Sequence, residues 1–168
     1  MAHYLKSNAP PITAGGTGKA PTMPWTTYAK RQCGLSMYSK GKNFLGAAVL
    51  LQRHGGHQYV VLHLICQGIE VALKGLLLIK DFDRFRPLMR RYGHNLTPLI
   101  RDALNEFGLA QMRPSLSTEL ESLSNLYSQH LLRYGSFYDL IVDPDTIPID
   151  LVIRRVTATL RLAERELR

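Results

Sequence analysis

An apolar segment between about residues 57 and 80 carries a polar stripe. Within its run from 59 to 79 nearly every residue is apolar, and the polar exceptions are His63, Gln67, Glu70 and Lys74. Their spacings of four, three and four residues place all four side chains on one face of an α-helix. The pattern therefore predicts a helix that packs on most sides and shows one narrow polar seam. That seam is either the solvent side of a core helix or the lining of a groove between helices.

Four further helices are predicted from apolar periodicity and from residues that cap or break helices. They cover about residues 27–53, 95–107, 114–132 and 148–168. Gly55 and Gly56 end the first of them, so it should form an antiparallel hairpin with the striped helix. Residues 81–92 and 133–148 are predicted to be connections, and no segment alternates long enough to indicate a strand. The predicted class is all-α, an up-and-down bundle of about five helices.

The chain divides into a tail and one domain. Residues 1–23 are rich in Pro, Gly and Ala without apolar periodicity, and they are predicted to be a disordered tail. Residues 24–168 suffice for a single core. The net charge is +8, and no acidic residue precedes Glu70. This basic N-terminal part would attract a polyanion, although a merely solvated basic face explains the charge as well.

Several features bear on the compartment. The run 59–79 is long enough to cross a bilayer, but its four polar side chains would be costly in lipid, and amphipathic helices on both sides offer soluble partners. No secretory signal is visible, and Cys33 and Cys66 are expected to be reduced thiols. We therefore expect a cytoplasmic protein that does not contact membranes.

The first candidate ligand site lies before the third helix. Residues 90–95 read Arg-Arg-Tyr-Gly-His-Asn, and Asn95 is a plausible N-cap. A helix start offers unpaired N–H groups, and Arg90 and Arg91 add positive charge, so a phosphate could bind here. Alternatively, His94 only caps or packs the helix start.

The second candidate site lies at the end of the fourth helix. Residues 127–135 read Tyr-Ser-Gln-His-Leu-Leu-Arg-Tyr-Gly. Arg133 could pair with a phosphate, and Tyr134 could stack on a base. Alternatively, the tyrosines belong to the core and Arg133 bridges to Asp139 or Glu70.

These motifs together resemble those of the HEPN family of helical bundles. The residues that carry the resemblance are Gln67-x-x-Glu70-x-x-Leu73-Lys74, followed by Gly93-His94-Asn95-Leu96. The Arg133-Tyr134 pair at a helix end resembles a motif of non-toxic HEPN proteins, which include partners of minimal nucleotidyltransferases. The resemblance implies a homodimer with a groove between its subunits and a nucleotide-binding site. The apolar excess of the striped helix also predicts a dimer.

One feature of HEPN ribonucleases is missing. Those enzymes carry an Arg, four to six further residues and then a His, and no Arg–His pair here has that spacing. The family's metal-independent mechanism is therefore not carried over, and we expect a non-catalytic protein that binds nucleotide or RNA. It would act with a nucleotidyltransferase, toxin–antitoxin or defence system.

Two rival hypotheses stay open. The first is a ribonuclease with a composite site, in which His94 or His130 faces an Arg such as Arg90 or one from another helix or subunit. The second is a protein–protein interaction module. No cofactor is expected, and no metal either, because the pair His54 and His57 would supply only two ligands.

Overall fold

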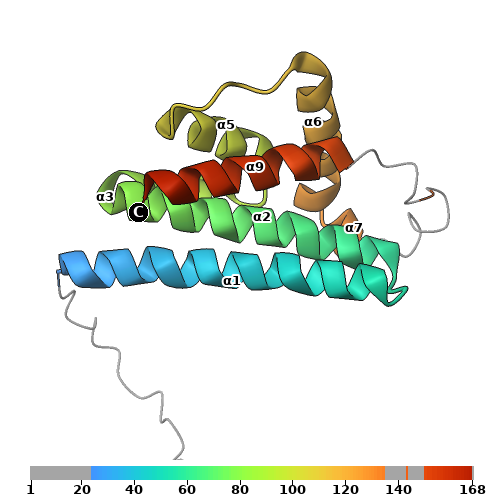
Figure 1. Ribbon diagram of the computed structural model, residues 1–168, viewed down its shortest axis with the longest axis horizontal. Coiled ribbons are helices and arrows are strands. Elements are labelled where there is room, and N and C mark those ends of the chain that lie inside the picture. The colour runs from blue at the N-terminus through green and yellow to red at the C-terminus, as the bar shows by residue number, and fades with distance from the viewer. Residues whose placement is uncertain (1–23, 135–142, 144–149, 168) are drawn as a thin grey trace, which may run out of the picture.

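The computed structural model describes residues 24–134, 143 and 150–167 (Figure 1). These residues form an all-α helical bundle without any strand, which confirms the predicted class. The predicted tail 1–23 and most of the predicted connection 133–148 lie outside the described residues.

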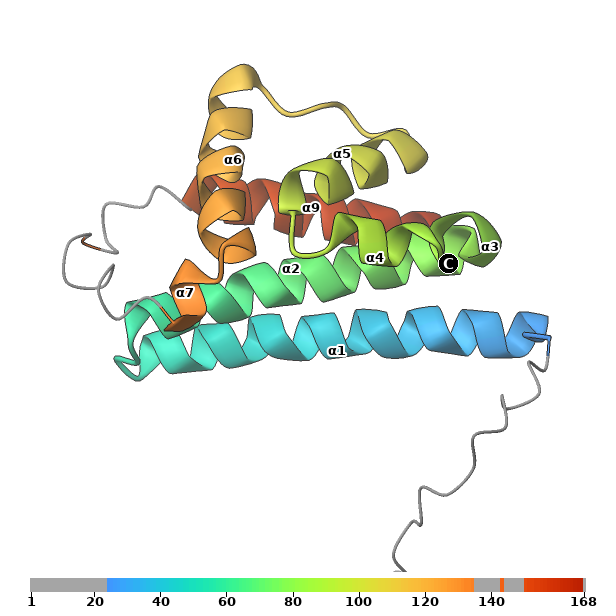
Figure 2. The ribbon, with the colours of Figure 1, turned by 180° about the vertical axis from the view of Figure 1, so that it is seen from behind.

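The long helices α1 (Thr27–Arg53) and α2 (Gln58–Lys80) form the predicted hairpin and run side by side (Figures 1 and 2). Their backbones come unusually close. A Cβ atom added at Gly41 would lie 2.4 Å from the Ala72 backbone nitrogen, and one added at Gly75 would lie 2.5 Å from that of Tyr38. Glycine at these positions therefore lets α1 pack directly on the backbone of α2.

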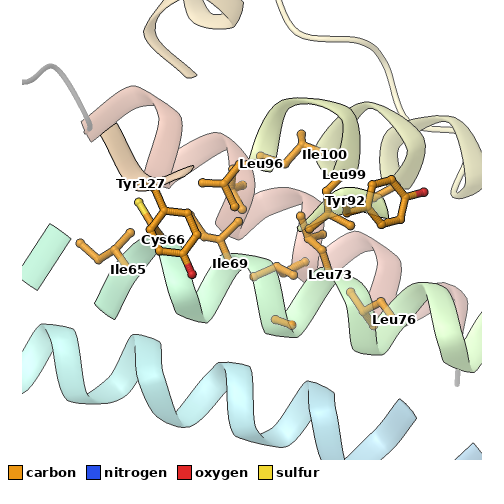
Figure 3. Packing of buried hydrophobic residues seen from close by; sticks show 14 of the residues in the cluster. Ile65, Cys66, Ile69, Leu73, Leu76, Tyr92, Leu96, Leu99, Ile100 and Tyr127 are labelled. Atoms are coloured by element: carbon orange, nitrogen blue, oxygen red, sulfur yellow. The ribbon is translucent and has the colours of Figure 1, made fainter. Parts of the chain in front are cut away.

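Helices α5 (Leu96–Glu106), α6 (Pro114–Ser128) and α9 (Asp150–Glu166) lie on the other side of α2 (Figures 1 and 2). Helix α6 stands steeply across the direction of α2. Helix α2 is thus the central element, and its apolar side chains pack against α5 and α6 (Figure 3). By length and composition alone α2 could cross a bilayer, and 72% of its most apolar window is buried inside the bundle.

The segment 81–92, predicted to be a connection, contains two short helices instead. They are α3 (Phe82–Phe85) and α4 (Leu88–Tyr92). The Asp81 carboxylate caps α3 by accepting a hydrogen bond from the Arg84 N–H at 3.1 Å, and Phe82 and Phe85 bury their rings. Local capping and ring burial therefore stabilise a turn too short to produce a periodic pattern.

The fourth predicted helix ends earlier than expected. Helix α6 stops at Ser128, and a separate short helix α7 covers Leu131–Tyr134. The break occurs at His130, whose φ of 60° lies in the left-handed region and is incompatible with a continuing right-handed helix. The short helix α7 packs on α2.

Candidate functional site

The polar stripe of α2 does not face solvent at its C-terminal half. Glu70 and Lys74 are only 6% and 8% exposed. The Lys74 Nζ donates to Glu70 Oε1 at 2.6 Å and to the Gly93 carbonyl oxygen at 2.7 Å. This is a buried ion pair rather than the surface pair that the spacing alone suggests, and it ties α2 to the segment before α5.

The second oxygen of Glu70 is also engaged. The Tyr127 hydroxyl donates to Oε2 at 2.7 Å, and Nδ1 of His94 lies 3.0 Å from the same atom. Burial raises the pKa of Glu70, but the hydrogen bonds from Lys74, His94 and Tyr127 outweigh it and hold the pKa below its ordinary value. Burial and the contact with Glu70 both raise the pKa of Tyr127. Glu70 is therefore an ionised acceptor, and Tyr127 is a neutral donor.

This carboxylate fixes the orientation of His94. An ionised carboxylate only accepts hydrogen bonds, so the contact assigns the N–H to Nδ1 of His94. In the neutral ring, Nε2 is then left with a lone pair. The His94 side chain is 44% exposed, so the imidazole is oriented by the buried Glu70 carboxylate and is still accessible to solvent.

Two more histidines lie around His94. The ring of His130 is 5.2 Å from that of His94, in an edge-on arrangement. The rings of His94 and His63 lie 5.5 and 5.6 Å from the ring of Tyr127. Burial lowers the pKa of His63, and the nearby positive charge of Arg133 lowers it further. The three imidazoles and the Arg133 guanidinium thus occupy one region above the first half of α2, which we call the His/Arg site.

The backbone at His130 is strained. A left-handed conformation costs a residue with a side chain about 1–2 kcal/mol, and His130 adopts it with a φ of 60°. Such outliers gather at ligand sites, where the surrounding structure holds them in place. Here the conformation ends α6 and starts α7, which carries Arg133.

The start of α5 differs from the expected phosphate cradle. Asn95 caps the helix as predicted, because its Oδ1 accepts from the Thr97 N–H at 3.1 Å. The Ser124 hydroxyl oxygen accepts from the Leu96 N–H at 2.9 Å and lies 3.0 Å from Asn95 Oδ1. Two of the backbone donors are therefore already used within the chain, and anion recognition beside His94 relies on side chains.

The remaining predicted residues are placed as follows. Arg90 lines a surface hollow with Asp83, Arg86, Pro87 and Met89, and Arg91 is exposed on α4. Tyr134 belongs to α7, but its side chain lies outside the described part. His63 and Gln67 are half-buried. The structure therefore joins His63, His94, His130 and Arg133 and places Arg90 in a different hollow.

Sequence reasoning missed two contributors, Ser124 and the bond from Tyr127 to Glu70. A signal for both was available. The buried face of α6 consists of Leu120, Leu123, Ser124 and Tyr127, which follow helical spacing. Polar residues inside such a face need buried partners, so they indicate a polar contact with another helix.

Comparison of the chain with protein-family models, with curated proteins and with solved structures finds no match. Among the described residues, no group of three or more His, Cys, Asp or Glu side chains could hold a metal ion. Imidazoles beside a guanidinium can bind an anion or transfer protons.

Proposed function

We propose that the protein binds the phosphate of a nucleotide or of RNA at the His/Arg site. The observation that carries the proposal is the convergence of His63, His94, His130 and Arg133. They come from α2, from the segment before α5, from the turn after α6 and from the short helix α7. Separate segments that bring cationic and proton-donating groups to one exposed surface are typical of an anion site.

The charges of the site support an anionic ligand. Glu70 is the carboxylate in contact with His94, and Lys74 offsets its charge at 2.6 Å. Arg133 brings a guanidinium to the same region, and each histidine adds a positive charge when it is protonated. His130 and Arg133 are exposed, so a phosphate can reach them without opening the fold.

Replacing Arg133 with alanine is expected to raise the Kd for a nucleotide or short RNA about tenfold, because a hydrogen bond to a charged group contributes about 1.5–3 kcal/mol. In wild-type protein the ligand should raise the Tm, and the rise should shrink with added salt. Arg161→Ala, which removes an exposed arginine of α9, is the matched control and should bind normally.

The competing explanation is nonspecific attraction to the acid-free N-terminal region. It predicts that a protein beginning at Met23 loses binding while Arg133→Ala keeps it. That pair of results would overturn the assignment to the His/Arg site. Normal binding by Lys6→Ala together with weak binding by Arg133→Ala would support it.

A second candidate function, RNA cleavage, is favoured by the bond between Glu70 and His94. A carboxylate that orients an imidazole is a common arrangement for general acid–base catalysis. His130 lies 5.2 Å away ring to ring and could serve as the second proton-transfer group, with Arg133 beside the phosphate. This is the composite site that the sequence left open.

Incubating the purified protein with single-stranded RNA in EDTA separates the two functions. The binding function predicts intact RNA. Cleavage that disappears in both His94→Ala and His130→Ala, with the Tm of each variant close to that of the wild type, would establish the ribonuclease instead.

A homodimer, implied by the HEPN resemblance, remains a proposal, but one argument for it is removed. The apolar residues of α2 that led us to expect a dimer are buried within a single chain. The exposed large apolar side chains of α1 include the aliphatic residues Leu35, Val49 and Leu50. They are now the better candidates for a subunit contact.

A further inference from the structure

We propose that a second surface, formed by Trp25, Tyr28, Arg86 and Arg90, binds the continuing strand of a single-stranded RNA whose phosphate occupies the His/Arg site. We call it the aromatic–basic surface. The inference rests on the proposed function and narrows it, because it names an oligonucleotide rather than a mononucleotide as the ligand.

The aromatic part of this surface is built on a buried support. Phe82 is buried, and its ring lies 5.1 Å from the ring of Trp25. The guanidinium carbon of Arg86 lies 5.4 Å from the Trp25 ring and 5.9 Å from the Phe82 ring. Trp25 is nevertheless 43% exposed, and Tyr28, three residues further on, is 73% exposed. The Trp25 ring is therefore presented to solvent beside the Arg86 guanidinium, and Tyr28 adds a second exposed ring close by in the sequence.

A hollow lies beside the Arg86 guanidinium that covers the Trp25 ring. Arg86 and Arg90 both line it, and its volume is about 630 Å³. Arg90 precedes His94 by four residues, and the intervening backbone is tied down because the Gly93 N–H donates to the Arg90 carbonyl at 3.2 Å. Figure 2 shows α4 next to α3 and leading into α5. Arg90 of the aromatic–basic surface and His94 of the His/Arg site thus belong to one short segment of the chain.

The charge of the surface suits a phosphate backbone. Asp83, the acidic residue at the hollow, pairs with Lys30 at 2.5 Å, and Arg84 pairs with Glu106 at 2.7 Å. Arg86 and Arg90 have no carboxylate partner among the described residues. Asp83 and Glu106 are therefore offset, and Arg86 and Arg90 remain to contact phosphates.

Exposed aromatic rings beside unpaired arginines are the elements that bind single strands. Stacking of a base on an aromatic ring contributes about 1–3 kcal/mol and tolerates any base, while cations follow the backbone. A mononucleotide has one base and one phosphate group, whereas a longer strand has enough of both to contact the two surfaces together. An anionic membrane could also attract tryptophan and arginine, but the short segment that Arg90 shares with His94 favours a strand.

The test compares two probes on the full-length protein: uridine 5′-monophosphate and a fluorescent oligouridylate of about eight nucleotides. Trp25→Ala and Arg86→Ala are each expected to raise the Kd for the oligouridylate about tenfold and to leave mononucleotide binding unchanged. Trp25→Phe should retain most of the oligouridylate affinity because it keeps a stacking ring. Arg161→Ala is again the matched control.

The outcomes separate this inference from the proposed function. One outcome is that Trp25→Ala and Arg86→Ala bind the oligouridylate like the wild type while Arg133→Ala binds both probes more weakly. The aromatic–basic surface then does not bind RNA, and the assignment of phosphate binding to the His/Arg site is supported. If Arg133→Ala leaves the Kd for both probes unchanged, the proposed function is wrong. The inference that an RNA strand is anchored at the His/Arg site is then wrong as well. Binding to phosphatidylserine vesicles that Trp25→Ala abolishes, with oligouridylate binding unchanged, would assign the surface to membranes and overturn the inference.

Discussion

Replacing Gly41 with alanine is expected to lower the free energy of unfolding by about 3 kcal/mol, at the upper end of what overpacking usually costs. The new Cβ would lie 2.4 Å from the Ala72 backbone nitrogen and 2.7 Å from its Cα. Backbone atoms of α2 cannot rotate away as the tip of a side chain can. Helices α1 and α2 would have to separate, and the contact that spans the whole hairpin would loosen. Urea unfolding followed by circular dichroism measures the loss.

Gly46→Ala is the matched control on the same helix. Gly46 is exposed, and a Cβ added there would have nothing within 4 Å. Alanine has the higher helix propensity, so this change should raise the free energy of unfolding by about 0.5–1 kcal/mol. Equal stability of the two variants would mean that the hairpin is less tightly packed than the structure shows.

The long helices could be predicted because their signals are local. The bounds of α1 follow from Thr26, which caps it, and from the glycines that end it, and both lie next to the helix in sequence. The turns α3 and α4 could not be predicted, since four or five residues are too few to show a period. The break at His130 has no sequence signal either, because a left-handed histidine depends on what holds it.

The candidate site illustrates the same limit. Helical spacing placed Glu70 and Lys74 on one face of α2 correctly, but it could not say what covers that face. The Glu70 carboxylate is buried by Tyr127, which is 57 positions away, and by His94, which is 24 positions away. In the sequence, His94 and Arg133 belong to separate motifs. Their proximity, and the inclusion of His63, follow only from how α6 and α7 pack on α2.

Replacing Glu70 with glutamine is expected to cost about 3–5 kcal/mol of folding stability, because it leaves a buried ammonium without its counter-ion. Lys74 is 8% exposed, and besides Glu70 it donates only to the Gly93 carbonyl among its hydrogen bonds in the described structure. A carboxamide can still accept from His94 or Tyr127. The loss of folding stability therefore comes mainly from the unpaired ammonium of Lys74. Denaturant unfolding of the variant measures this loss.

The second substitution Lys74→Met should restore much of this loss, because removing both charges of a buried pair costs far less than removing one. Unfolding of the wild type, Glu70→Gln, Lys74→Met and the double variant forms a double-mutant cycle, and the coupling between the two positions should reach about 2–3 kcal/mol. Additive losses would show that the pair is hydrated rather than buried. Strong coupling would establish that Glu70 is held as a buried carboxylate, which is the condition for orienting His94 in either proposed function.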